Sequence, residues 1–323
     1  MSTKVFITID TEEDNWGEYE ETIGTVDNIL TLPRLQSLFN KYGAIPTYLI
    51  NYPVASQQQS INILSSLLSE GRCEIGTHCH PWNTPPFVEE LNSKTSRMCN
   101  LSYDLLIMKM NYLHKTIEDN FHVNPVTFRA GRWAFNENVA RCLTELGYLV
   151  DTSMTPFVDW SNTHGENYRG TPTHPYYFKA DNIRKHDAIG DLLEVPPTIG
   201  FCQSNTKLCD LVKNKISKGA LSKFHLLGIL ERLNLLNFHW LSPELSNGKE
   251  MIKLSQSFVK SGHHFLNMSF HSTSLLPGKN SFVKNNYELS ILLNNIEVFL
   301  QYAAKNNFEF LPLSKAASIV ERH

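Results

Sequence analysis

The sequence lacks any long apolar run. No window reaches the roughly 18 uninterrupted apolar residues of a membrane-spanning helix. The first residues, MSTKVFITID, enter a strand-like alternation and lack the apolar stretch of a secretory signal. These absences predict a cytoplasmic protein.

Paired cysteines and blocks of basic charge are also absent. Six cysteines are scattered at positions 73, 79, 99, 142, 202 and 209 without a CxxC pair, so we expect reduced thiols. The formal net charge is -3 and no long basic block occurs, so nothing indicates a nucleic-acid partner. The 41% hydrophobic and 19% charged residues are typical of a globular protein.

Strand-like and helix-like segments alternate along most of the chain. Strands are expected at 4–10, 45–50, 73–77, 126–128, 149–153, 192–195, 265–270 and 309–311. Helices are expected at 26–41, 61–68, 103–119, 139–146 and 291–304. This alternation predicts an α/β protein with a mostly parallel sheet, either a barrel or an open doubly wound sheet. The stretch 204–261 looks helical without a clear strand, and we interpret it as an insertion within a single domain, 1–323.

Polar residues at the ends of the expected strands distinguish the two sheet types. Asp10, His78, Arg129, Asp151 and His271 each lie at or just past the C-terminal end of a different strand. Side chains from five strands converge most easily when the strands form a ring, whereas an open sheet concentrates its site at one switch point. The pattern therefore favours a barrel.

Two of these strand ends carry residues spaced two apart. Asp10 and Glu12 share one face of an extended chain, and so do His78 and His80. An acidic pair of this kind supplies a base and a ligand for a hard metal, although a solvated acidic turn is the plainer interpretation. Two imidazoles on one face suit zinc and similar ions, and the intervening Cys79 points the other way.

The other strand ends are less specific. A buried Arg129 would need a carboxylate partner, with a surface salt bridge as the alternative. Asp151, in Asp-Thr-Ser, also fits an ordinary turn. His271 follows the apolar strand 265–270 and is the third histidine at a strand end.

Taken in this order, the features resemble the polysaccharide deacetylase family, which is carbohydrate esterase family four and carries the NodB homology region. The resemblance spans about residues 4–313. It implies a distorted (β/α) barrel of about seven strands with the active site at the C-terminal strand ends. It also implies a metal-dependent hydrolase that removes N-acetyl groups from sugars, in the biosynthesis of cell-surface or envelope polysaccharides.

The chain departs from the family pattern at three points. Thr11 stands where a second aspartate is usual, so the acidic ligand is Glu12 or, as the alternative, Asp14. Residue 82 is Trp where the second histidine of the pair is usual, which leaves His80. The third motif of the family usually has a proline where Ala130 or its neighbour stands. These differences indicate a divergent branch.

The resemblance assigns roles to the site residues. Glu12, His78 and His80 would hold a divalent metal, with Zn²⁺ as the first expectation. Asp10 would be the base, held by Arg129, and His271 would be the acid. Asp151 would orient His271 or a neighbouring group. Trp82, Arg132 and Trp133 are candidates for contact with the sugar, with buried packing as the alternative for each tryptophan.

Two other functions stay open. One is hydrolysis of another non-peptide C–N bond, as in allantoinase-like relatives, and the other is sugar binding without catalysis. A binding module would have no need for both a base and an acid, which argues against the second.

The stretch from Lys207 to Arg232 is locally basic, with six basic and two acidic residues, and 224–241 is rich in leucine. The plainer interpretation is a helix pair with solvated lysines. The sharper one is a peripheral contact with the inner face of the membrane. Such a contact would suit an N-acetylated sugar or glycan that is carried on a lipid.

Overall fold

The computed structural model describes residues 2–15, 24–217, 228, 230 and 232–322. Eleven strands lie in this part of the chain: β1 Lys4–Thr11, β2 Thr47–Ile50, β3 Glu74–Cys79, β4 Thr127–Ala130, β5 Val150–Asp151, β6 Tyr176–Phe178, β7 Leu192–Glu194, β8 Ile199–Phe201, β9 Phe238–Trp240, β10 Phe265–His271 and β11 Glu309–Phe310. The described α-helices are α1 Leu32–Tyr42, α2 Tyr52–Ser56, α3 Gln58–Ser69, α4 Tyr103–Phe121, α5 Glu137–Glu145, α6 Thr206–Ser217, α8 Gly248–Lys260, α9 Asn286–Lys305 and α10 Ala316–Ile319. None of these helices is both long and apolar enough to cross a membrane.

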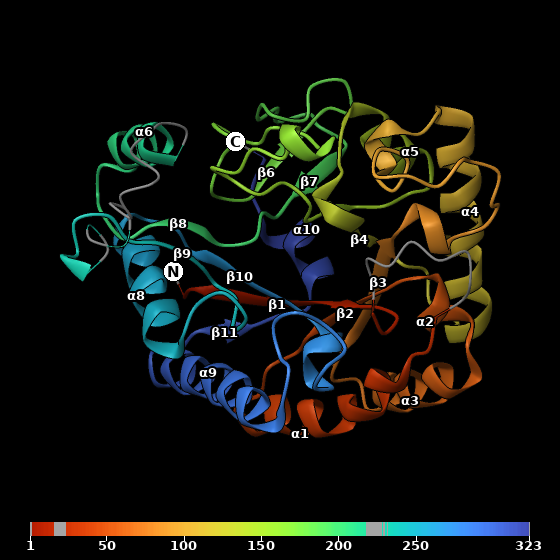
Figure 1. Cartoon of the computed structure of the whole chain (residues 1–323), viewed down its shortest axis with the longest axis horizontal. Coiled ribbons are helices and arrows are strands. Elements are labelled where there is room, and N and C mark those ends of the chain that lie inside the picture. Colours follow the sequence, from red (N-terminus) through yellow and green to blue (C-terminus); the bar gives the residue numbers. More distant parts are fainter. Residues whose placement is uncertain (1, 16–23, 218–227, 229, 231, 323) are drawn as a thin grey trace.

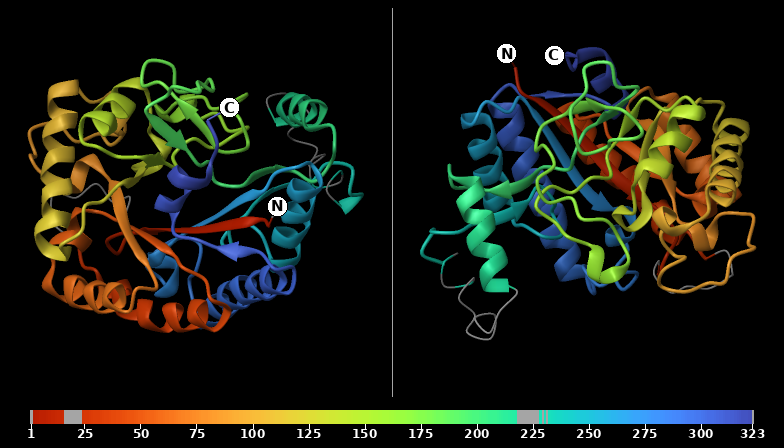
Figure 2. Two further views of the ribbon diagram at one scale, coloured as in Figure 1. Left: turned by 180° about the vertical axis from the view of Figure 1, so that it is seen from behind. Right: turned by 90° about the horizontal axis from the view of Figure 1, so that it is seen from above.

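The main sheet has the strand order β10-β1-β2-β3-β4-β5-β7-β6, and β11 also pairs with β1. All pairings are parallel except that of β6 with β7. The sheet curls around a central space, and helices α9, α1, α3 and α4 lie outside it (Figures 1 and 2). This confirms the predicted distorted (β/α) barrel.

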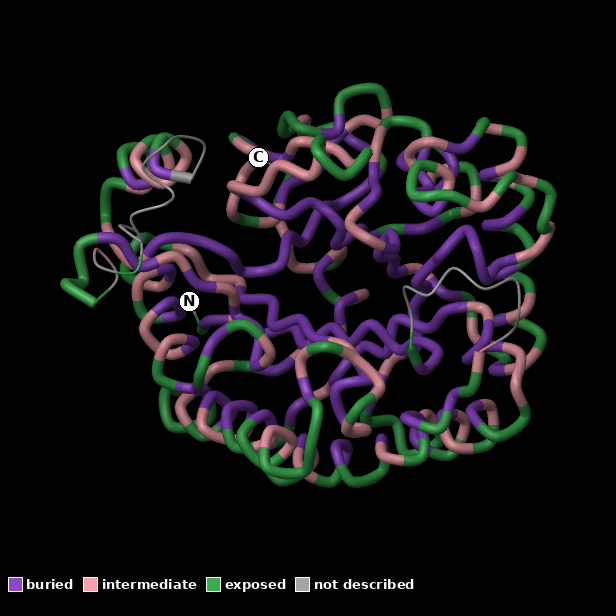
Figure 3. Tube along the Cα trace, viewed as in Figure 1, coloured by how far each residue is buried: buried purple, intermediate pink, exposed green. Residues whose placement is uncertain are grey.

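Strand β1 shows how the sequence builds this architecture. Its odd-numbered residues Val5, Ile7 and Ile9 are buried in the large core between the sheet and the helices. Its even-numbered residues alternate to the other face, where Phe6 packs in a separate inner cluster. Asp10 belongs to this inward series. Figure 3 shows the resulting burial of the strands, with exposure confined to outer helix faces and loops.

The inner cluster closes the end of the barrel opposite the site. Phe6 contacts Val150 and Leu193 there, together with Leu313 and Ala316 from the chain's last turns. Helix α10 accordingly lies inside the curl of the sheet in Figure 1. The interior is thus apolar at this end and polar at the C-terminal strand ends.

The expectation that 204–261 contains no strand is wrong. Strand β9 lies in this stretch and pairs antiparallel with β8 as a separate two-stranded sheet. Phe238 of β9 packs against Phe201 of β8 with ring centroids 4.9 Å apart. Helices α6 and α8 agree with the expected helical character, but residues 218–227, 229 and 231, with Lys218, Lys223 and Glu231, lie outside the described residues. That the whole chain forms one domain remains a prediction.

Helix α4 carries a fully buried lysine that holds the loop after β3. Lys109 Nζ donates hydrogen bonds to the carbonyl oxygens of Pro81 at 2.9 Å, Thr84 at 2.7 Å and Pro86 at 2.7 Å. It also lies 2.8 Å from Glu89 Oε1. The loop that begins at the predicted metal-binding strand end is therefore fixed to α4 by one ammonium group.

We predict that Lys109→Met lowers the free energy of unfolding by about 3–5 kcal/mol, because it leaves Glu89 and three carbonyl oxygens buried without their cation. Chemical denaturation measures this change. Lys115→Met, at an exposed position of the same helix, is the control and should stay within about 0.5 kcal/mol of wild type. Equal stability of the two variants would contradict the structural role of Lys109.

Candidate active site

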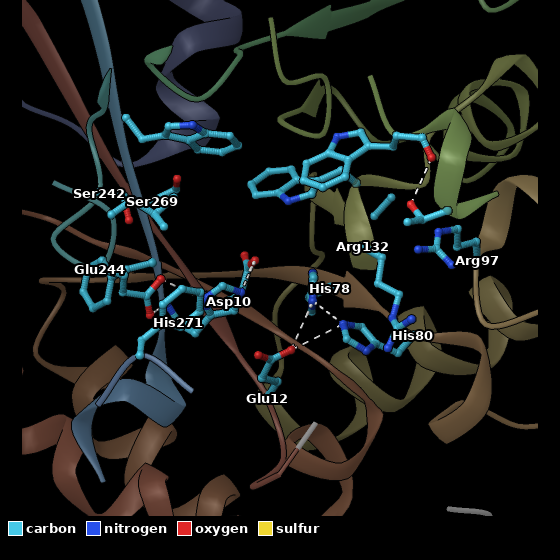
Figure 4. Close-up of a pocket in the computed structure, with 18 residues that line it drawn as sticks. Asp10, Glu12, His78, His80, Arg97, Arg132, Ser242, Glu244, Ser269 and His271 are labelled. Atoms are coloured by element: carbon cyan, nitrogen blue, oxygen red, sulfur yellow. Dashed lines mark hydrogen bonds and ion pairs between the residues drawn. The ribbon is translucent and has the colours of Figure 1, made fainter. Parts of the chain in front are cut away.

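Three side chains from the C-terminal ends of β1 and β3 form a candidate metal site. Glu12 follows β1, His78 lies near the end of β3, and His80 follows that strand. Glu12 Oε2 is 3.5 Å from His78 Nε2 and 3.3 Å from His80 Nε2, and the two Nε2 atoms are 2.6 Å apart. One potential ligand atom from each residue lies within 4.8 Å of the others (Figure 4).

The donor groups have the protonation and orientation that a divalent cation requires. His78 Nδ1 lies 3.0 Å from the carbonyl oxygen of Arg129, which can only accept, so this nitrogen donates and Nε2 keeps its lone pair. Burial lowers the pKa of His78 to about 4, which keeps the imidazole neutral. Neither carboxylate oxygen of Glu12 accepts a hydrogen bond within the described part of the chain.

The electrostatics of Glu12 fit the same ion. Its pKa is raised well above the usual range, first by burial and then by the nearby carboxylates of Glu13 and Asp10. A buried carboxylate among other acids is costly unless a cation compensates it. The orphaned oxygens, the lone pairs and the missing positive charge therefore all fit a divalent metal.

Asp14, the alternative acidic ligand, is engaged elsewhere. Its carboxylate accepts hydrogen bonds from Thr25 Oγ1 at 2.8 Å, the Asp27 amide at 3.0 Å and Asn28 Nδ2 at 2.8 Å. Lys279 Nζ lies 3.4 Å away. Asp14 thus organises the turn before η1 (Asp27–Thr31), and the geometry favours Glu12 as the ligand.

Asp10 and Arg129 form the buried ion pair expected from the sequence. Arg129 Nη1 donates to Asp10 Oδ1 at 2.6 Å, Nη2 donates to Thr8 Oγ1 at 2.6 Å, and Nε donates to the carbonyl oxygen of Thr152 at 3.0 Å. Burial alone would raise the pKa of Asp10, but Arg129, together with His78 and His271, outweighs burial and the net shift is downward. Asp10 is therefore an ionised carboxylate at the edge of the cavity.

His271 faces Asp10 from β10, which pairs with β1 in register at these two residues. Its Nε2 is 3.8 Å from Asp10 Oδ2, and its Nδ1 is 2.9 Å from Glu244 Oε2. Burial acts to lower the pKa of His271, but the carboxylates of Glu244 and Asp10 outweigh it and the pKa is raised. The imidazole is thus held in one orientation with a tendency to be protonated.

Glu244, and not Asp151, orients His271, so a neighbouring group remains of the two alternatives expected for Asp151. The Asp151 carboxylate accepts hydrogen bonds from the hydroxyl and the amide of Ser153 at 2.6 and 3.2 Å. Its register partner on β7 is Glu194, and burial raises the pKa of Asp151 to about 6. Glu244 lies in a loop between β9 and α8, where no strand-end signal marked it.

These groups open into one cavity of about 380 Å³. In Figure 4, Glu12 lies below Asp10, His78 and His80 lie to its right, Glu244 and His271 lie to its left, and Arg97 and Arg132 lie further to the right. The aromatic part of the lining consists of Trp133, Trp160, Trp240, Phe270 and Phe282. Arg132 and Trp133 line the cavity as expected, whereas Trp160, Trp240, Arg97 and Glu244 were not predicted.

Trp82 does not line this cavity, contrary to expectation. It is only 3% exposed and packs on the His80 ring with centroids 4.0 Å apart. Its Nε1 donates to Glu13 Oε1 at 3.3 Å. Trp82 therefore supports the metal-binding loop from behind instead of contacting a ligand.

Local backbone geometry after β4 turns Trp133 toward the cavity. Arg132 and Trp133 have φ values of 56° and 57°, a conformation that side chains with a Cβ rarely adopt. Such residues persist where the surroundings hold them and cluster at functional sites. Gly131 precedes them because a Cβ there would overlap the His80 ring and the Cys79 carbonyl oxygen.

The sequence matches no known family profile and no curated protein. Solved structures do resemble the chain. A protein assigned as a glycoside hydrolase/deacetylase from Parabacteroides distasonis aligns with 98% of this chain and 71% of its own, at TM-score 0.63 and 11% identity. A protein assigned as a polysaccharide deacetylase from Mycobacterium smegmatis aligns with 98% and 90%, at TM-score 0.55 and 16% identity.

The Puue allantoinase also aligns with 98% of this chain and 89% of its own, at TM-score 0.53 and 11% identity. Likeness at these identities concerns the fold, which serves more than one reaction. Together with the strand order and the strand-end site, it shows that the chain has the fold of the polysaccharide deacetylases, a distorted (β/α) barrel.

Proposed function

We propose that this protein is a metal-dependent deacetylase that hydrolyses the N-acetyl group of a sugar. The observation that carries the proposal is the meeting of Asp10, paired with Arg129, and His271, paired with Glu244, beside the Glu12–His78–His80 group in one cavity. A base, an acid and a cation site are the three components that amide hydrolysis requires. Proteins that are assigned as deacetylases have the same fold.

Glu12, His78 and His80 would hold the metal. Two imidazoles and one carboxylate form a ligand set that suits Zn²⁺. When bound, the ion supplies Lewis-acid chemistry, in that it polarises a carbonyl oxygen and makes an attacking water more acidic.

The chain's own residues handle the protons. Asp10 is ionised in the resting site, and its Oδ2 accepts a proton as water adds to the acetamide carbon. The C–N bond then breaks, and His271 Nε2 gives a proton to the leaving nitrogen, so that acetate and a free amino sugar result. His271 Nε2 and Asp10 Oδ2 are 3.8 Å apart, so the proton donor and the proton acceptor can both reach the same acetamide group.

The lining of the cavity supports a sugar as the substrate. Trp133 and Trp240 lie with ring centroids 5.9 Å apart, and Trp160 lines the same space. Indole faces stack on the apolar face of a pyranose ring, and Arg97 and Arg132 offer donors to hydroxyl groups or an anionic substituent. These aromatic walls favour a sugar over the small polar substrate of an allantoinase.

The biological setting belongs to the same proposal. A role in cell-surface or envelope polysaccharide biosynthesis, at a cytoplasmic site, would present the acetylated sugar on a nucleotide or on a lipid carrier. The substrate panel below therefore contains both kinds of sugar.

The direct test is acetate release from N-acetylated sugars that are free, nucleotide-linked or lipid-linked, with allantoin as a comparison. We predict release from at least one sugar and a loss of about a hundredfold or more in Asp10→Asn and in His271→Ala. Asp119→Asn and His186→Ala replace exposed residues of the same types and should keep the wild-type rate. Turnover of allantoin alone would establish the rival function.

Metal content tests the two histidine ligands separately from the proton-transferring residues. We predict that His78→Ala and His80→Ala purify with little metal, whereas Asp10→Asn keeps the wild-type amount because Asp10 accepts a proton in the reaction and does not bind the ion. Elemental analysis by plasma mass spectrometry measures the content. Equal metal in all four proteins would refute the ligand assignment, and loss in Asp10→Asn would make Asp10 a ligand.

The Glu244–His271 pair predicts a change in pH dependence. His271 must be protonated to donate, so kcat/KM falls as pH rises through its pKa, which Glu244 and Asp10 raise against burial and Arg129. Glu244→Gln removes one of the two carboxylates and should move the alkaline limb of the pH profile to lower pH. Metal content should stay unchanged. A rate loss without any shift of that limb would give Glu244 a purely structural role.

A further inference from the structure

Strands β8 and β9 and helix α6 form a small lobe beside the barrel, with a core of its own. Phe201 of β8, Cys209 of α6 and Leu236 are buried together, with Phe238 packed against them. Helix α6 stands apart from the main sheet in the left-hand view of Figure 2, whereas β8 and β9 lie beside β10. No residue of α6 belongs to the candidate metal site or to the proton-transferring pair Asp10 and His271.

The outer face of α6 is apolar, although water covers it. Leu208 is 55% exposed and Leu211 is 64% exposed, and Lys215 is exposed one turn further along the same face. Cys209 and Ile216, on the other side of the helix, are buried. Helix α6 thus has one apolar side that packs and a second that does not.

The turn before β9 carries two further exposed leucines of the lobe. Leu233 and Leu235 are each 61% exposed. Four exposed leucines on one small lobe contrast with the scattered single apolar residues of an ordinary surface. The lobe is therefore built to contact something apolar.

The charge of the lobe indicates which kind of apolar partner the lobe contacts. Lys207, Lys215 and Arg232 are exposed cations beside the leucines. Asp210, the acidic residue of α6, is neutralised by Arg169 Nη2 at 2.7 Å. Leucine together with basic charge is the pattern of segments that enter the interface of an anionic lipid bilayer.

A second copy of the chain fits this surface less well than an anionic lipid bilayer does. A symmetric contact through this face would bring Lys207 and Lys215 against the same lysines of the other copy. The net charge of the whole chain is -3, so the basic lobe is a local exception that an anionic surface would attract.

The position of the lobe relates this surface to the cavity. In the right-hand view of Figure 2, α6 extends on the side of the molecule toward which β10 points, which is the side of the C-terminal strand ends. Strand β9 runs from the lobe directly into the cavity wall, where Trp240, Ser242 and Glu244 lie. A lipid surface against the lobe would therefore lie beside the mouth of the cavity.

We propose that α6 and the turn before β9 dock the protein on anionic phospholipid, with Leu208, Leu211, Leu233 and Leu235 in the interface and Lys207, Lys215 and Arg232 at the headgroups. The lobe binds the surface without spanning the bilayer. The inference concerns membrane contact alone and does not depend on the reaction proposed above.

Co-sedimentation of the full chain with vesicles tests the inference. Wild type should sediment with mixed phosphatidylcholine–phosphatidylglycerol vesicles at low salt, less at high salt, and little with phosphatidylcholine alone. Replacing both Leu208 and Leu211 by Gln, which keeps helix propensity, should reduce binding about tenfold or more. Replacing Lys207 and Lys215 by Gln should weaken binding and reduce its salt dependence.

Leu30→Gln is the matched control, because Leu30 is 56% exposed and lies away from the lobe on η1. It should bind like wild type, and all variants should keep the circular dichroism spectrum and the thermal unfolding temperature of wild type. No sedimentation of wild type, or equal binding by the Leu208/Leu211 variant, would overturn the inference. So would a wild-type dimer in analytical ultracentrifugation that this variant dissociates, since a second copy would then be the occupant.

Discussion

The buried contact between Arg129 and Asp10 is the constraint on which the polar half of the barrel depends. A guanidinium with no exposure is tolerated only when its donors are matched, and here Asp10, Thr8 and Thr152 match them. Thr8 in turn donates to Asn267 Oδ1 at 2.9 Å. One charge thus fixes side chains of β1, β4 and β10 at the same level of the barrel.

The same contact separates the two carboxylates of the first loop. Asp10, next to Arg129, has a lowered pKa, whereas Glu12, two residues away and without such a partner, has a raised one. Two acids of similar type therefore differ in what stabilises their negative charge. Arg129 compensates the charge of Asp10, whereas burial and the neighbouring acids disfavour the charge of Glu12, and this difference is the physical basis for proposing different roles for the two residues.

Periodicity made much of this site predictable from the sequence. Residues two apart at the end of a buried strand must share a face, so Asp10 with Glu12 and His78 with His80 could be placed together. Parallel strands in a ring then brought them near Arg129 and His271. Zinc as the ion, and the single domain, remain predictions.

The errors arose where periodicity carries no information. Strand β5 has only two residues, so its sequence could not tell whether Asp151 points to the site or to Glu194. Strand β9 has three residues inside a helical stretch, and the loop after it supplies Glu244. A loop residue can be placed only once the elements on both sides of it are known.

The pairing of β1 with β10 has a consequence for how the protein is made. Asp10 lies beside His271 across a contact between residues 261 positions apart (271 minus 10), and Glu12 donates its amide proton to Ser272 Oγ at 3.2 Å. Contacts of such high sequence separation form late and slow folding. On the ribosome, the first strand emerges long before its partner, and one of its edges must wait unpaired while most of the chain is translated. Nascent chains truncated before β10 would thus expose an apolar strand edge, and chaperones would have the longest time to act on the N-terminal strand.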